Sequence, residues 1–166
     1  PASLARPDFA REPSFYERHV YRERPSRDQY QRLAEHYLWL SRVPLQSMEQ
    51  ALASLSMTTM CIRNLNQSLF LNPQNSEAYR SLGVAYQHLG DLEILISGQP
   101  GQSTRQQLRY LQCVMALRQA LKGNPDDPLI WEVLFQQYQM QQKKDLVSEC
   151  LEHWLPLQEN RLDDVE

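Results

Sequence analysis

The side chains that most often perform catalysis or hold metals are present in this chain, but they do not fall into a recognised spacing. Its histidines, His19, His36, His88 and His153, are scattered, and no two of them are four residues apart on one helix. The sequence has no Gly-x-Ser-x-Gly turn for a nucleophile, no glycine-rich phosphate loop and no His-Glu-x-x-His zinc motif. We therefore expect no catalysis by this chain, no cofactor and no metal centre.

The remaining reactive groups have structural explanations. Cys150 and His153 are three residues apart, which can seat a metal, but no second pair of ligands accompanies them. The carboxylate pairs at 126–127 and 163–164 lie where helix capping and a C-terminal tail account for them. The 3 cysteines include no Cys-x-x-Cys pair, which favours reduced, buried thiols and a reducing compartment such as the cytoplasm.

Composition and charge narrow the classes of partner. The 166 residues are 42% hydrophobic and 22% charged, as in an ordinary soluble domain, and the formal net charge is -3. A negative net charge argues against a protein that binds nucleic acid through a cationic surface. Even the Arg- and Tyr-rich segment 16–32 contains Glu and Asp residues among its arginines. No apolar run approaches the roughly 18 residues of a membrane span, so we expect no direct membrane insertion.

The first 25 residues differ from the rest in being punctuated by proline at 1, 7, 13 and 25, which disfavours long helices. Aromatic residues in this segment could anchor it to a folded body: Phe9, Phe15, Tyr16 and Tyr21. We expect residues 1–25 to form an extended arm that packs on its own molecule or on a symmetry-related one. The second case would make the protein a homo-oligomer.

Beyond the arm the chain is expected to be helical throughout. Ser26 and Gln29 have the capping-box spacing and open a helix over 26–41. Apolar residues then recur at helical spacing in separate stripes over 45–55, 57–71 and 79–89, with Gly90 closing the last. Further expected elements are a loop at 97–104 and helices over about 104–122, 128–142 and 144–158. No segment alternates with period two, so we predict an all-α fold with no sheet.

An internal repeat emerges from the spacing of Tyr79, Leu82, Gly83 and Tyr86. One weaker copy of this pattern covers Leu45 to Pro73, and another begins at Trp131. The middle copy is longer than the period because it holds extra residues near 93–103. The pattern resembles the tetratricopeptide repeat, which has a period of about 34 residues. The third copy departs from the family at Phe135, where a small residue is usual, and the first keeps little beyond apolarity.

This resemblance implies a right-handed superhelix of antiparallel helical hairpins, an α-solenoid, over residues 26–161. In this scheme helix 26–41 is a cap, and the tail 162–166 is acidic. The repeats occupy about 42–75, 76–127 with an insertion near 93–103, and 128–161. Cys61 and Cys113 stand where the family favours alanine, so we expect them to pack in the core.

In the tetratricopeptide family a partner peptide binds the concave face formed by the first helix of each hairpin. The residues that this implies for the groove are Gln46, Gln50, Ala53, Arg80, Val84, Gln87, His88, Glu132, Gln136, Gln139 and Met140. Subfamilies that clamp acidic C-termini use Lys, Arg and Asn there. Here Gln50, Val84 and Gln136 replace Asn and only Arg80 is cationic, so we expect no tight binding of acidic C-terminal peptides.

Two functions of different classes remain open. The first is a non-catalytic interaction scaffold that binds a partner peptide or domain on the concave face. The second is a structural or regulatory appendage of a larger enzyme or membrane protein. Because a fold does not give its function, the resemblance by itself leaves the partner unidentified.

Overall fold

The structure is a computed structural model that describes residues 27–41, 46–98 and 103–164. Within these ranges the chain is all-helical and has no strand, which confirms the predicted all-α class. The helices are α2 (Arg27–Ser41), α3 (Met48–Leu71), α4 (Ser76–Ser97), α5 (Thr104–Gly123), α6 (Pro128–Met140) and α7 (Lys144–Asp163). None of them is both long enough and apolar enough to cross a lipid bilayer.

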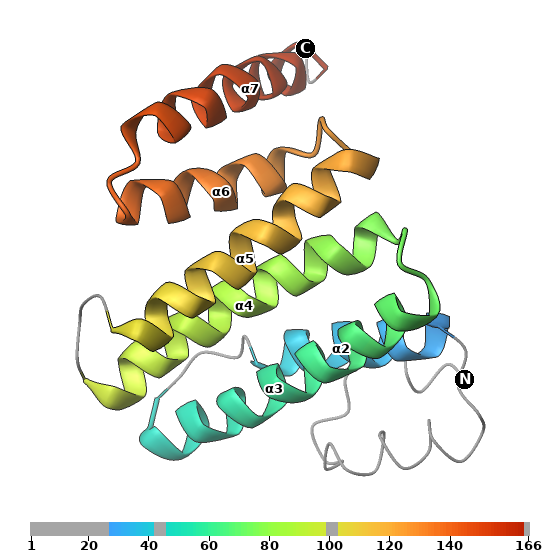
Figure 1. The fold of residues 1–166 in the computed structure, drawn as a ribbon, viewed down its shortest axis with the longest axis vertical. Coiled ribbons are helices and arrows are strands. Elements are labelled where there is room, and N and C mark those ends of the chain that lie inside the picture. The colour runs from blue at the N-terminus through green and yellow to red at the C-terminus, as the bar shows by residue number, and fades with distance from the viewer. Residues whose placement is uncertain (1–26, 42–45, 99–102, 165–166) are drawn as a thin grey trace.

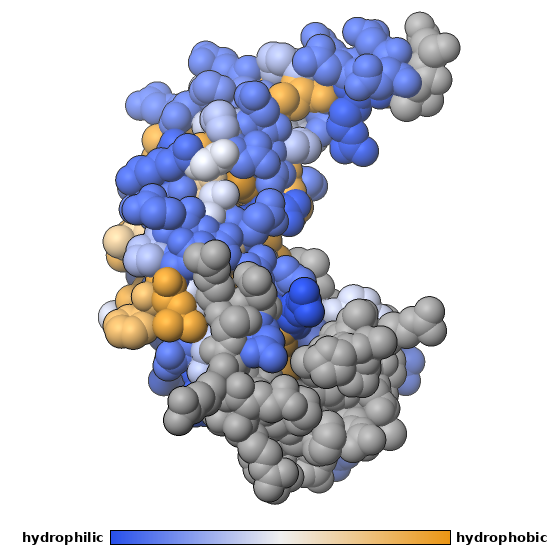
Figure 2. Space-filling view, turned by 90° about the vertical axis from the view of Figure 1, so that its right-hand side faces the viewer, coloured by the Kyte–Doolittle hydropathy of each residue, from blue (hydrophilic) through white to orange (hydrophobic). Residues whose placement is uncertain are grey.

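The helices pack in chain order, and consecutive helices run in opposite directions (Figure 1). Extensive contacts join α2 to α3, α3 to α4, α4 to α5 and α6 to α7, whereas α5 and α6 touch more sparsely. A hydrogen bond from Asn75 Nδ2 to Gln31 Oε1, at 2.8 Å, also ties the start of α4 to α2. Seen from the side, the upper, C-terminal end of the molecule projects beyond the helices below it, and its surface is mainly hydrophilic (Figure 2).

Local capping signals explain where the helices begin. Side-chain oxygens of Ser47, Asn75, Ser103 and Asp127 accept hydrogen bonds from backbone N–H groups in the first turns of α3, α4, α5 and α6. These bonds satisfy donors that a helix start otherwise leaves unpaired. Pro128 follows Asp127 at the first turn of α6, as expected from its fixed backbone angle.

One prediction about the elements is wrong: the stripes at 45–55 and 57–71 lie on the single helix α3. No glycine or proline separates them, so nothing local breaks the helix. The hydroxyls of Thr58 and Thr59 instead donate to the carbonyls of Ser54 and Leu55, at 2.8 and 2.9 Å, within the helix. The described residues 46–75 therefore hold no hairpin of their own, and α3 pairs with α2.

Two further boundaries differ from expectation. Helix α4 continues past Gly90 to Ser97, so residues 93–97 of the expected insertion are helical. Leu92 is buried and the Glu93 carboxylate contacts Arg109 of α5 at 2.6 Å, which holds this extension against its neighbour. At the other end, α7 runs through Pro156 to Asp163 rather than stopping at 158, and so enters the predicted acidic tail.

The buried apolar side chains form two clusters that meet at α4. The first joins α2, α3 and α4 around Leu33, Tyr37 and Leu65. The second joins α5, α6 and α7 around Leu117 and Leu134. Tyr79 and Tyr86 of α4 pack against both clusters, so α4 connects the two halves of the core. The predicted arm 1–25, with its aromatic anchors, and the capping residue Ser26 lie outside the described residues.

Candidate functional site

The predicted groove residues on α3 do not lie on the first helix of a hairpin. Gln46, Gln50 and Ala53 are exposed near the start of α3, which is the second helix of the α2–α3 pair. The Gln50 side-chain oxygen accepts from the Gln46 N–H, and the Gln50 N–H donates to Ser47 Oγ at 3.2 Å. These glutamines therefore stabilise the start of the helix, because α3 is continuous where a hairpin was expected.

On α4 the predicted groove residues have different environments. Val84 is 5% exposed, so the expectation that it lines an open surface is wrong; its position on α4 faces packed neighbours. Arg80 Nε lies 2.6 Å from Oδ2 of the largely buried Asp127, an ion pair rather than a well-directed hydrogen bond. His88 Nε2 is 3.3 Å from Ser54 Oγ of α3. Val84 is therefore buried by packing and Arg80 is paired with Asp127, so neither side chain is free to contact a partner.

On α4 and α6 the structure does bring predicted groove residues together. Gln87 Nε2 of α4 donates to Gln136 Oε1 of α6 at 2.8 Å. The other predicted residues of α6 are all exposed: Glu132, Gln139 and Met140. Gln87, Gln136 and Met140 therefore belong to one surface, and this surface borders a cavity.

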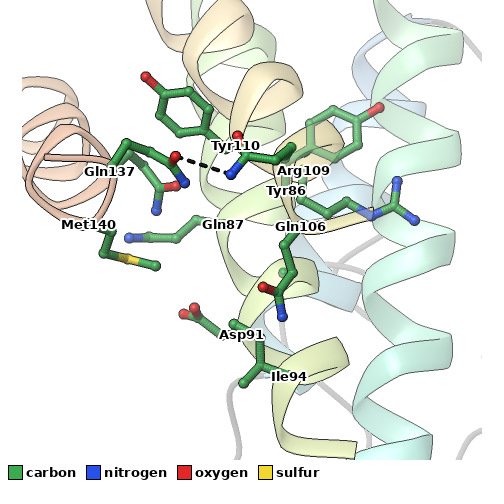
Figure 3. A pocket seen from close by; sticks show the side chains of 12 residues that line it. Tyr86, Gln87, Asp91, Ile94, Gln106, Arg109, Tyr110, Gln137 and Met140 are labelled. Atoms are coloured by element: carbon green, nitrogen blue, oxygen red, sulfur yellow. Dashed lines mark hydrogen bonds between the residues drawn. The ribbon is translucent and has the colours of Figure 1, made fainter. Parts of the chain in front are cut away.

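A pocket of about 300 Å³ lies between α4, α5 and α6 (Figure 3). Its walls combine amide, aromatic and aliphatic side chains with two charged groups. The lining residues are Tyr86, Gln87, Gly90, Asp91, Ile94, Gln106, Gln107, Arg109, Tyr110, Gln137, Met140 and Gln141. Gln107 Nε2 of α5 donates to Gln141 Oε1 of α6 at 3.2 Å, which closes one wall of the pocket (dashed line in Figure 3).

The two charged groups of this pocket are not equivalent. Arg109 donates from Nε to Glu93 Oε1 at 2.6 Å and from NH1 to Gln112 Oε1 at 3.0 Å, so its charge is compensated. Asp91 has no ion pair or hydrogen bond among the described residues. Desolvation raises the pKa of the Asp91 carboxyl above its ordinary value, and the nearby His88 partly opposes this rise. The pocket thus contains one carboxylate that forms no ion pair or hydrogen bond among the described residues.

A second cavity, of about 550 Å³, opens between α3, α4 and α5. Leu55, Thr59 and Ile62 of α3 form one wall, and Arg105 and Arg109 of α5 form part of another. Both arginines face Glu93, at 3.5 and 2.6 Å, so a single carboxylate pairs with two guanidinium groups in this cavity. It contains none of the predicted groove residues.

Sequence reasoning missed most of the first pocket because half of its lining comes from α5 and from the extension of α4. Asp91 and Ile94 follow Gln87 by four and seven residues, so helical periodicity could have placed all three on one face. Gln106, Arg109 and Tyr110 lie on the far side of the 98–103 connection. No local signal showed that this part of α5 turns toward α6.

The cysteines have the structural role that was predicted for them. Cys61 and Cys113 are fully buried in the two core clusters, and burial raises the pKa of Cys113 to about 12. Cys150 is also buried, whereas His153 is exposed and stacks on Trp131 with ring centroids 4.3 Å apart. Across the described ranges, no three His, Cys, Asp or Glu residues are grouped as a metal site would require.

Comparison of the chain with models of known protein families and with curated protein sequences finds no significant match.

Proposed function

We propose that this chain is a non-catalytic protein–protein interaction scaffold of the tetratricopeptide type, with the hairpins α2–α3, α4–α5 and α6–α7 stacked as a right-handed superhelix. On this proposal a partner peptide or domain lies along the concave face and engages the pocket between α4, α5 and α6. The hairpin boundaries differ from those deduced from sequence, since α2 takes the place of the first helix of the first pair.

The packing of α4 against α5 supports this repeat type. In the best-matching copy, the small residue Gly83 faces Leu117, and a Cβ built on Gly83 would lie 2.4 Å from Leu117 Cδ2. Leu82 and Cys113 are buried beside this contact. A glycine is needed because the two helices approach too closely for any side chain, which is the role that the family assigns to this position.

The observation that carries the proposed function is the amide-rich pocket beside Gln87 and Met140. An amide side chain both donates and accepts hydrogen bonds, as a peptide backbone does. Gln87 of α4 and Gln106 of α5 are half-buried in this one cavity, which Gln137 of α6 also lines although it is 6% exposed. Such a surface suits an extended peptide, whose backbone groups need partners of both kinds.

The same geometry argues against a clamp for acidic C-terminal peptides. Arg80, the only cation among the predicted groove residues, is paired with Asp127, and Val84 is buried. A terminal carboxylate would also meet the acidic Asp91 in the pocket. The expectation of weak binding to free acidic C-termini therefore stands as part of this proposal.

The proposal is tested by selecting ligands from a random 12-residue peptide library and measuring their affinity by calorimetry. The double variant Gln87→Ala/Met140→Ala removes two side chains of the pocket and should weaken the selected peptides about tenfold or more, as loss of a few buried contacts does. Gln119→Ala, an exposed amide on α5, is the matched control and should bind as the parent does. Selection of no saturable ligand, or equal affinity for both variants, would contradict the proposal.

One observation favours the second candidate, a structural appendage. Leu108, Leu111 and Met115 lie three and four residues apart on α5 and are 48%, 52% and 69% exposed. An apolar helical stripe of this kind suits a lasting contact with a larger assembly. Loss of that assembly in Leu111→Glu, with no loss in Gln87→Ala/Met140→Ala, would favour the appendage over the peptide scaffold.

A further inference from the structure

We infer that the pocket between α4, α5 and α6 selects a lysine side chain of the bound peptide, with the Asp91 carboxylate as the counter-charge for its ammonium group. This inference rests on the proposed peptide-binding function and adds to it the chemistry of the residue that is recognised. The charge, the shape and the hydrogen-bonding groups of the pocket each favour a lysine side chain.

The charge of the pocket favours a cation. Arg109 pairs with Glu93 at 2.6 Å, a carboxylate that also faces Arg105 at 3.5 Å, whereas Asp91 forms no ion pair or hydrogen bond among the described residues. Asp91 is exposed to solvent, so its carboxylate is open to an incoming ammonium group, with which it can form a charge-assisted hydrogen bond. The Nε2 of His88, whose charge acts on Asp91 from the same helix, lies 3.3 Å from Ser54 Oγ of α3.

The shape of the pocket favours a cation at the end of a long aliphatic chain. Ile94 follows Asp91 by three residues on α4, and Met140 comes from α6 opposite (Figure 3). Tyr86 and Tyr110 add aromatic walls. A lysine side chain has an apolar stem that packs on such walls while its charged head reaches a polar group. A small free ammonium ion would leave these apolar walls without a partner.

The amides around the pocket distinguish a peptide from a free amine. The half-buried Gln87 and Gln106 present amide groups beside the carboxylate rather than a second negative charge, although Gln87 Nε2 also donates to Gln136. They match the backbone amides on either side of a lysine, whereas a dication or a polyamine would need more than one carboxylate. Lysine within a peptide is therefore the occupant that satisfies both parts of the lining.

The probe is a series of acetylated, amidated Ser-Ala-X-Ala-Ser peptides in which X is lysine, norleucine or 2,4-diaminobutyrate. Norleucine keeps the aliphatic stem without the charge, and diaminobutyrate keeps the charge on a shorter stem. Dissociation constants are measured by NMR titration of the isotope-labelled full chain. We expect the lysine peptide to bind about tenfold more tightly than the norleucine peptide, as for a hydrogen bond to a charged group. The diaminobutyrate peptide should bind between them.

Asp91→Asn should abolish the lysine preference, because the amide keeps the shape of the side chain but not its charge. Asp126→Asn is the matched control: it makes the same change of charge at an exposed aspartate in the turn before α6 and should leave the preference intact. Helical circular dichroism of both variants verifies that they are folded. Equal binding of lysine and norleucine peptides, or a lysine preference that survives in Asp91→Asn, overturns the inference.

The outcomes separate this inference from the proposed function. If all three peptides shift the signals of Gln87 and Met140 with equal affinity, lysine selection fails while peptide binding survives. If no peptide of the series and no library-selected peptide moves those signals, the proposed function fails and the inference fails with it.

Discussion

Arg118 of α5 joins residues of three helices through one guanidinium group. Its Nε donates to Tyr138 Oη at 3.0 Å, and its terminal nitrogens donate to the two carboxylate oxygens of Glu149 at 3.2 and 3.1 Å. This bidentate contact, with two parallel hydrogen bonds, is the favourable geometry for an arginine–carboxylate pair. It holds the pKa of Glu149 below its usual range, although both side chains remain partly open to water.

The pair predicts a pH-dependent stability. Because the folded-state pKa of Glu149 is lowered, its contribution is present above the unfolded-state pKa and is lost as pH falls through the folded-state pKa. Glu149→Gln should cost about 0.5 kcal/mol at pH 7, a value kept small by solvent screening, and nothing at about pH 2. Urea unfolding at both pH values measures this, with exposed Glu152→Gln as the control. An equal cost at both pH values would show that packing, not charge, is lost.

The buried cysteines predict low thiol reactivity. Cys61, Cys113 and Cys150 are each 0% exposed, and burial raises the pKa of Cys113 to about 12 and of Cys150 to about 11. The reactive species is the thiolate, which is scarce and inaccessible in this state. Ellman's reagent at pH 8 should therefore leave the folded protein unmodified over minutes and react with all 3 cysteines in guanidinium chloride. A rapid reaction of the folded protein would show that one of these helices opens readily.

At the scale of the helices, the close approach of α4 and α5 depends on Gly83. Gly83→Ala would place a methyl group 2.4 Å from Leu117 Cδ2, so the helices must separate or Leu117 must leave its position. We expect a loss of about 1–3 kcal/mol, typical of overpacking in a core. Thermal or urea unfolding measures this loss.

Gly90→Ala is the control for this substitution because it lies on the same helix. Its Cβ would meet Arg109 Cβ at an ordinary 3.4 Å, and alanine favours the helix over glycine by roughly 1 kcal/mol. We expect Gly90→Ala to be neutral or stabilising. Similar losses for both glycines would mean that the α4–α5 contact is looser than the structure indicates.

Asp127 caps α6 and also binds α4. Its Oδ1 accepts from the Leu129 N–H at 3.0 Å, and its Oδ2 lies 2.6 Å from Arg80 Nε. Asp127→Ala loses both contacts and should cost about 1–2 kcal/mol. Asp127→Asn keeps a capping oxygen and should cost less. If the two variants unfold at the same urea concentration, the cap contributes little and the ion pair accounts for the loss.

At the scale of the whole molecule, the sparse contact between α5 and α6 predicts uneven stability. Helix α4 packs against α3 and α5 and contributes to both core clusters, whereas α6 and α7 form the terminal pair. We expect amide hydrogens of α6 and α7 to exchange faster than those of α4, since local opening follows the density of packed contacts. Hydrogen exchange followed by mass spectrometry measures this difference. Uniform exchange rates would instead indicate one cooperative unit.

The all-helical class and most helix ends could be predicted from the sequence because their causes are local. Asp127-Pro128 starts α6, and Gly123-Asn124 ends α5, through contacts made within a few residues. The continuity of α3 was predictable by the same logic, since no breaker interrupts it. Two short apolar stripes on one long helix have the same local spacing as two separate helices, so periodicity alone does not distinguish the two arrangements.

Only the tertiary structure decided what the predicted site residues do. Val84 is buried, Arg80 is neutralised by Asp127, and Gln87 meets Gln136 because separate helices pack against these positions. The pocket around Asp91 arises in the same way, from α4, α5 and α6 together. A helix carries its own capping and periodicity in sequence, but the exposure and charge balance of a side chain depend on neighbours that are distant along the chain.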